Sequence, residues 1–156
     1  MSKNTRFLTH AAVIAALYAV LTHLQNVLLP GSTTWAIQMR LSEALCVLSF
    51  FTPAAIPGLT VGCLVFNITY AAALPLDFLV GSLATLLAAG GMWLTRRVTV
   101  KGYPLLGMAM PALFNALLVG WELTVYIGGG FFMNALYVAL GELAVLLTFG
   151  TALYLS

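Results

Sequence analysis

The scarcity of charge is the feature that most constrains this chain. Only 6% of its 156 residues are Asp, Glu, Lys or Arg, whereas about 25% of an ordinary soluble domain is charged. Apolar residues make up 62% of the chain. Because so few charged side chains cannot cover a soluble globule, the composition argues against a soluble domain, a nucleic-acid-binding protein and a disordered chain. The sequence therefore predicts an all-α membrane protein.

The apolar residues fall into six long runs, separated by turn residues such as Pro30-Gly31 and Gly128-Gly129-Gly130. A spanning helix needs about 20 residues to cross roughly 30 Å of hydrocarbon, so six spans use most of the chain and a seventh has no room. We predict one six-helix transmembrane domain over residues 1–156. Its spans are expected at residues 7–29, 37–55, 56–73, 78–94, 105–126 and 131–155.

Two basic segments predict the orientation, because short cytoplasmic loops carry an excess of Lys and Arg. One segment precedes the first span and the other lies between the fourth and fifth. Together they contain Lys3, Arg6, Arg96, Arg97 and Lys101. With six spans both segments fall on one side, so both termini are expected in the cytoplasm. The start also resembles a signal peptide, but no small-residue cleavage site leads into a polar mature sequence, and we expect it to be retained.

All four carboxylates fall in the outer half or the centre of the predicted spans. Glu43 and Glu122 lie near the outer ends of the second and fifth spans. Asp77 marks the outer start of the fourth span, and Glu142 lies near the middle of the sixth. A charge at mid-helix costs roughly 2.5–3.5 kcal/mol, so acids retained there indicate function. Arg40 precedes Glu43 by three residues on one helix face, so we expect the two to pair, with Arg40 orienting Glu43.

Amide and aromatic side chains accompany the acids. Asn67 and Asn115 fall near the middle of their spans, and Trp121 lies at an outer end, where it is either a ligand contact or an interfacial anchor. A pocket of carboxylates and amides suits a small polar cation or a base with several N–H donors, because a carboxylate accepts two parallel hydrogen bonds from an amidine-like edge. The predicted substrate-binding residues are Arg40, Glu43, Asn67, Asp77, Asn115, Trp121, Glu122 and Glu142.

The sequence contains no pattern that indicates an enzyme. His10 and His23 share one span at a spacing that does not suit joint metal ligation. Cys46 and Cys63 lie in apolar runs and are expected to be buried thiols. No Gly-rich phosphate loop is present. We therefore expect no metal and no cofactor, and the energy for any transport must come from a gradient or from another chain.

Small residues line the first span in overlapping small-xxx-small steps: Ala11, Ala12, Ala15, Ala16 and Ala19. Such residues let a second helix approach closely in lipid. We predict a partner interface here, with packing inside the chain's own bundle as the alternative. The spacing leaves the register open between Ala11, Ala15 and Ala19 on the one hand and Ala12 and Ala16 on the other.

Four segments carry a resemblance to a known family: residues 5–12, 37–45, 52–58 and 76–82. They are similar to the QueT family, whose members are substrate-binding S components of energy-coupling factor (ECF) transporters for queuosine precursors. The run Gln38-x-Arg40-x-Ser42-Glu43-Ala44 is the most specific part. The resemblance implies an S-component bundle in the cell membrane with an outward-facing pocket. It also implies that the alanine-rich first helix docks on a transmembrane coupling subunit, which carries two cytoplasmic ATPases.

The same resemblance implies a ligand. Queuosine precursors are deazaguanines, some with a cationic aminomethyl arm. We expect one of Glu43, Glu122 and Glu142 to accept hydrogen bonds from the guanine-like edge, and another acid or an amide to meet the arm. Asn67 and Asn115 would read the remaining groups.

Two other functions remain as alternatives. One is a stand-alone secondary carrier of a small organic cation, with Glu142 as the proton-coupling site. Many carriers are built from internal repeats, and the two halves of this sequence differ in the placement of their polar residues. The other is a structural or enzymatic membrane protein that transports no ligand.

Overall fold

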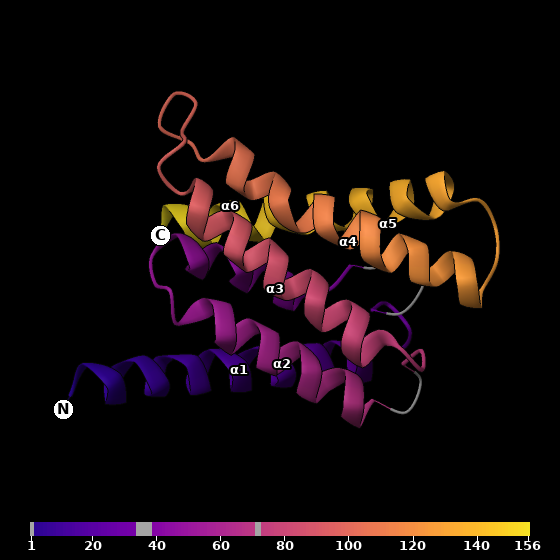
Figure 1. Ribbon diagram of the computed structural model, residues 1–156, viewed down its shortest axis with the longest axis horizontal. Helices are drawn as coiled ribbons and strands as arrows, with labels where there is room; N and C mark the ends of the chain where they lie inside the picture. Colours follow the sequence, from indigo (N-terminus) through magenta and orange to yellow (C-terminus); the bar gives the residue numbers. More distant parts are fainter. Residues whose placement is uncertain (1, 34–38, 71–72) are drawn as a thin grey trace.

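The computed structural model describes residues 2–33, 39–70 and 73–156. The chain folds into helices that run back and forth along one bundle (Figure 1). The last three helical elements follow one another without a break, so the described residues form six consecutive helical segments. The elements are α1 (Lys3–Leu28), η1 (Leu41–Phe50), α2 (Ala55–Thr69), α3 (Asp77–Thr95), α4 (Leu105–Tyr126), α5 (Phe131–Val145), η2 (Leu146–Gly150) and α6 (Thr151–Leu155).

Four of the six segments are long and apolar enough to cross a bilayer: α1, α3, α4 and the continuous helix Phe131–Leu155. Their bounds lie close to the spans predicted at 7–29, 78–94, 105–126 and 131–155. The helical membrane-protein class is therefore confirmed. The other two segments are shorter, with 10 residues in η1 and 15 in α2.

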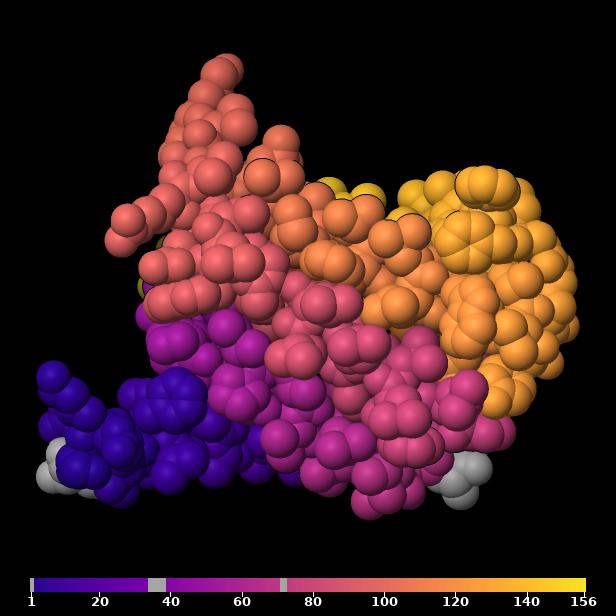
Figure 2. All heavy atoms as spheres, in the orientation of Figure 1, coloured from indigo at the N-terminus to yellow at the C-terminus, as the bar shows by residue number. Residues whose placement is uncertain are grey.

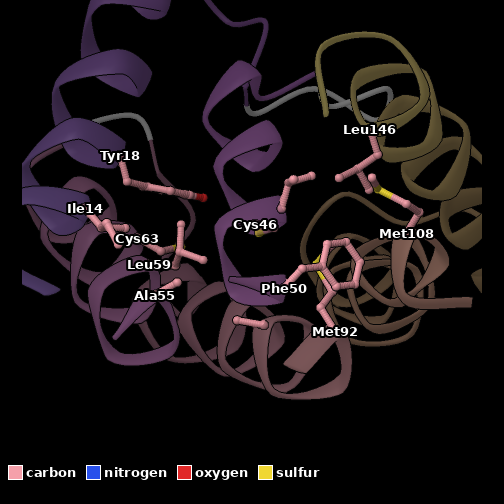
Figure 3. Close-up of a cluster of buried hydrophobic side chains, with 12 residues drawn as sticks. Ile14, Tyr18, Cys46, Phe50, Ala55, Leu59, Cys63, Met92, Met108 and Leu146 are labelled. Carbon is pink, nitrogen blue, oxygen red and sulfur yellow. The ribbon is translucent and has the colours of Figure 1, made fainter. Parts of the chain in front are cut away.

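The second predicted span, 37–55, differs most from the structure. Its helical part is η1 alone, a 3₁₀ helix, and Ile37 and Gln38 of the prediction lie outside the described residues. Ten residues of 3₁₀ helix rise about 20 Å, and runs of this length are uncommon. η1 packs against α1, α2, α3, α5 and η2, and the close-up places it between its neighbours (Figure 3). Irregular backbone at membrane depth is tolerated where protein encloses it.

The two ends of the bundle differ in charge. The start of α1, the C-terminus and the loop between α3 and α4 lie at one end, on the left of Figure 1. These segments carry the five bases of the two basic segments. The C-terminal ends of α1, α2 and α4 lie at the opposite end. This is the arrangement that the predicted orientation requires.

Close backbone contact joins α1 to α2 through two glycines one turn apart. A methyl group built on Gly58 would lie 2.8 Å from the carbonyl oxygen of Ala11, and one on Gly62 would lie 2.7 Å from that of Ala15. Any larger residue would force the helices apart, so this pair packs as small-xxx-small sequences do in membranes.

An apolar cluster fills the centre of the bundle around η1 (Figure 3). It includes Tyr18 of α1, Cys46 of η1, Cys63 of α2 and Met92 of α3. Both cysteines are free and buried, which confirms the prediction of buried thiols. The cluster fixes η1 in position, and the first residues of η1 carry the acidic chemistry described next.

Candidate ligand-binding site

A buried ion pair joins the start of η1 to the start of α3. The Nη2 of Arg40 lies 3.2 Å from the Oδ2 of Asp77, and the two residues are 4% and 3% exposed. The Nε of Arg40 also donates to the carbonyl oxygen of Thr33 at 3.1 Å. The guanidinium carbon stands 5.7 Å from the ring centroid of Phe66, within the range of a cation–π contact.

The prediction that Arg40 pairs with Glu43 is wrong. The three-residue spacing aligns two side chains only when both residues are helical. Arg40 is instead the N-cap of η1, with an extended backbone at φ −83° and ψ 106°. The side chain of Arg40 therefore does not lie on the helix face that carries Glu43. It crosses the bundle and donates to Asp77.

Glu43 takes its partners from the protein itself. The hydroxyl of Tyr18 donates to Oε1 of Glu43, and the thiol of Cys46 donates to Oε2 at 3.2 Å. Glu43 is 1% exposed. The hydrogen bond from Tyr18 holds η1 against α1. Each oxygen of Glu43 accepts one hydrogen bond from the protein and keeps a second lone pair.

A polar face of α1 fixes the segment that leads to Glu43. The Thr22 hydroxyl donates to that of Ser42 at 2.7 Å, and the backbone N–H of Leu41 donates to Oε1 of Gln25 at 2.8 Å. Asn26 donates to the hydroxyl of Thr33 at 2.7 Å. This face was not predicted from the sequence. Its signal is the helical spacing of Tyr18, Thr22, Gln25 and Asn26.

Asn67 and Asp77 lie together beside Gly81. The Nδ2 of Asn67 donates to the backbone carbonyl of Asp77 at 2.8 Å. A methyl group built on Gly81 would lie 2.8 Å from Oδ1 of Asp77 and 2.9 Å from Nδ2 of Asn67. Only a glycine at this position leaves both side chains where they are, so the packing of α3 sets this part of the site.

Several of the predicted ligand-binding residues keep buried polar atoms without a hydrogen-bond partner in the described parts of the chain. Buried polar groups are usually paired, and leaving one unpaired costs about 1–3 kcal/mol. Five of the predicted residues carry such atoms, and the hydroxyls of Ser49 and Ser82 are unpaired as well. On the five predicted residues, the atoms are Oδ1 of Asn67, Oδ1 of Asp77, Nδ2 of Asn115, both carboxylate oxygens of Glu122 and Oε2 of Glu142.

Arg40 lies within electrostatic range of both Glu122 and Glu142. Glu122 feels the charges of Asp77 and Arg40, and Glu142 feels that of Glu43. Asn115 lies two turns from Glu122 on the buried face of α4. The buried polar residues of η1, α3, α4 and α5 thus face the inside of the bundle, and their role as one ligand site stays a prediction.

Trp121 does not join this buried group. It is 49% exposed, whereas its neighbour Glu122 is fully buried. Adjacent residues on a helix point about 100° apart, so the two side chains face different surroundings. Tyr126, at the end of α4, is also exposed. Exposed aromatics at a helix end are typical of interfacial anchors.

The alanine stripe of α1 divides between packing and surface. Ala19 is buried, and Ala11 and Ala15 lie against the two glycines of α2. Ala12 and Ala16 are exposed. An apolar groove of about 260 Å³ runs between α1 and α2, lined by Leu8, Ala11, Ala12, Ala15, Pro57 and Val61.

Within residues 2–33, 39–70 and 73–156, no group of three His, Cys, Asp or Glu side chains is close enough together to hold a metal ion. The arrangement instead offers oxygen acceptors in a buried place, which bind N–H donors and cations.

Comparison with known proteins gives one match. A family model described as QueT transporter matches residues 8–156, nearly the whole chain. No curated protein and no solved structure matches it.

Proposed function

The chain belongs to the QueT transporter family, and on that premise we propose that it is the substrate-binding subunit of an ECF-type importer that captures a queuosine precursor. The observation that carries this proposal is the imbalance among the unpaired buried atoms. Carboxylates and amides contribute five oxygen acceptors, on Asn67, Asp77, Glu122 and Glu142, against one amide donor, on Asn115. The unpaired hydroxyls of Ser49 and Ser82 can donate or accept. A ligand that fits them is rich in N–H groups and carries positive charge.

A deazaguanine with an aminomethyl arm has both properties. Its ring presents two neighbouring N–H groups that a carboxylate accepts in parallel, and its arm is an ammonium group at neutral pH. Three buried acids, Glu43, Glu122 and Glu142, have no salt-bridge partner within the described residues. A cationic ligand would offset part of that charge.

The charge asymmetry of the bundle supports capture from outside the cell. The segments that carry Lys3, Arg6, Arg96, Arg97 and Lys101 lie at one end, which the positive-inside rule places in the cytoplasm. Asp77 begins α3 at the other end, and Glu122 lies in the last turns of α4 before that end. With η1 and α2 counted as crossings, the chain spans the plasma membrane six times, and its ligand site faces outward.

The groove between α1 and α2 is our candidate for the contact with a coupling subunit, which would bring the ATPases. The N-terminal half of α1 extends beyond the other helices toward the basic end (Figure 2). Ala12 and Ala16 are exposed along it. Small exposed residues allow a helix of the partner to approach closely.

The bound small molecule tests the function directly. We expect the protein, purified in mild detergent from cells that make queuosine, to retain a deazaguanine that mass spectrometry identifies after denaturation. A buried, charge-assisted site releases its ligand slowly, so an equimolar amount is expected. A different class of molecule in that amount, or a protein that binds no added deazaguanine, would contradict the proposal.

Docking has its own test. Replacing Ala12 by leucine fills the exposed side of the groove, and we expect it to reduce co-purification of the coupling subunit and ATPases at least tenfold. Ala152→Leu is the matched control, because Ala152 is exposed on α6 at the same end, and it should leave the complex intact. Equal recovery of partners with both variants would place the interface elsewhere. Ligand uptake by the chain alone would instead support the secondary carrier.

A further inference from the structure

The loop between α3 and α4, residues 96–104, concentrates positive charge at one end of the bundle. It contains Arg96, Arg97 and Lys101 and no acid. Arg97 and Lys101 are exposed, and none of the three bases forms a salt bridge with a residue that the structure describes. Their charge is therefore available to an anion from outside the chain.

A tight turn presents Lys101 at the tip of this loop. Val100 and Tyr103 exchange two backbone hydrogen bonds, at 2.9 and 3.1 Å, so the turn between them has two residues. Both have positive φ, 53° for Lys101 and 82° for Gly102, as a type I′ turn requires. Asn, Asp or Gly is the usual residue at the position of Lys101. A lysine there carries a conformational cost, which indicates that the charge at the tip has a function.

Exposed apolar side chains accompany the bases. Leu94, at the end of α3, is 78% exposed, and Val98, Val100 and Leu105 are each more than half exposed. At a membrane surface such side chains enter the boundary between headgroups and acyl chains. Lys and Arg next to them extend their charged ends to the headgroups. The loop therefore has the composition of a segment that lies on a membrane.

Two further observations place the loop at the membrane surface. The guanidinium carbon of Arg96 stands 3.6 Å from the ring centroid of Trp93, and tryptophan is enriched where helices leave the hydrocarbon. The loop also projects sideways from the end of the bundle, at the upper left of Figures 1 and 2. Because the helices run across the membrane, a sideways projection follows the membrane surface, where the lipid phosphates lie.

We propose that this loop binds the phosphate of anionic phospholipids in the cytoplasmic leaflet, with Arg97 and Lys101 as the phosphate ligands. Figure 1 shows α1, which lines the groove assigned to the coupling subunit, along the opposite edge of the bundle. A subunit docked in that groove would leave the loop facing lipid. The lipid site depends on the orientation of the bundle and not on the identity of the transported molecule.

Native mass spectrometry of the full chain measures which lipids stay bound. From micelles with equal amounts of phosphatidylglycerol and phosphatidylcholine, the wild type should retain at least fivefold more phosphatidylglycerol, because each base near an anionic surface strengthens binding about fivefold. The double variant Arg97→Gln with Lys101→Asn should reduce this ratio to less than twofold. Asparagine adopts positive φ readily, so the change removes charge and keeps the turn. Lys3→Gln with Arg6→Gln is the matched control, because it removes two exposed bases at the same end, and it should keep the fivefold ratio.

Three results would overturn the lipid site. They are equal retention of both lipids by the wild type, an equal loss of preference in the two double variants, and an unchanged lipid ratio in the loop variant together with loss of the coupling subunit or ATPases. The last result would mean that the loop contacts a protein. Thermal unfolding without added lipid is the folding control, and the loop variant should unfold at or above the wild-type temperature. Deazaguanine binding enters none of these measurements, so the lipid site and the proposed function fail separately.

Discussion

Replacing Arg40 by methionine is expected to destabilise the bundle by about 3–5 kcal/mol, the cost of leaving one partner of a buried ion pair alone. Arg40 and Asp77 are both nearly excluded from the surface. Without the guanidinium, the carboxylate of Asp77 loses its only salt bridge among the described residues. Titration with a denaturing detergent, followed by circular dichroism, measures the change in the free energy of unfolding.

Two further variants identify the cause of this loss. Arg97→Met removes an exposed arginine and should change stability by less than about 0.5 kcal/mol. The double variant Arg40→Met with Asp77→Leu removes both charges and should recover most of the stability, because a buried pair replaced by apolar residues is often neutral. If the double variant loses as much stability as the single variants Arg40→Met and Asp77→Leu lose together, the ion pair is not the source of the effect.

The second large effect is expected at Gly62, where even a methyl group has no room. Its Cβ would lie 2.7 Å from the carbonyl oxygen of Ala15 and 2.7 Å from Cβ of Tyr18. Because backbone atoms cannot rotate away, Gly62→Ala should destabilise the protein by about 1–3 kcal/mol, as overpacking does. The displaced Tyr18 should also loosen its hydrogen bond to Glu43.

Gly90→Ala is the control for this substitution. Gly90 lies inside α3, and a methyl group there meets no atom within 4 Å. The helix preference for alanine over glycine should make this variant equally stable or up to about 1 kcal/mol more stable. The same unfolding titration compares the two. Equal stability of the Gly62 and Gly90 variants would mean that α1 and α2 are less closely packed than described.

The two interactions prepare the site in different ways. The ion pair of Arg40 and Asp77 ties the start of η1 to α3, and the contact of Gly62 with α1 holds Tyr18 where it meets Glu43. Ligand affinity should therefore fall in both variants, even though neither change removes an atom that we assign to the ligand. A site held by such contacts is preorganised, which reduces the cost of binding.

Composition and hydropathy were sufficient to predict the four long helical segments, because lipid admits few charges and requires long apolar segments. The same cost explains why Glu122, Glu142, Asn67 and Asn115 are buried, since a polar group inside an apolar run must face the bundle. The depth of a residue along its span could also be predicted from the sequence. Asp77 and Glu122 were placed at one level by counting residues, and they lie within electrostatic range.

Pairing depended on the tertiary structure. Arg40 meets Asp77 from 37 residues away and Glu43 meets Tyr18 from 25, distances along the chain at which spacing carries no information. The local rule failed at Arg40 because its backbone is extended. The fold also decided which alanines face α2 and which stay exposed. By itself the sequence determined which residues must avoid lipid, because that depends on each residue's own hydration. Only the tertiary structure decided which partner each of them meets, because that depends on how helices distant in sequence pack together.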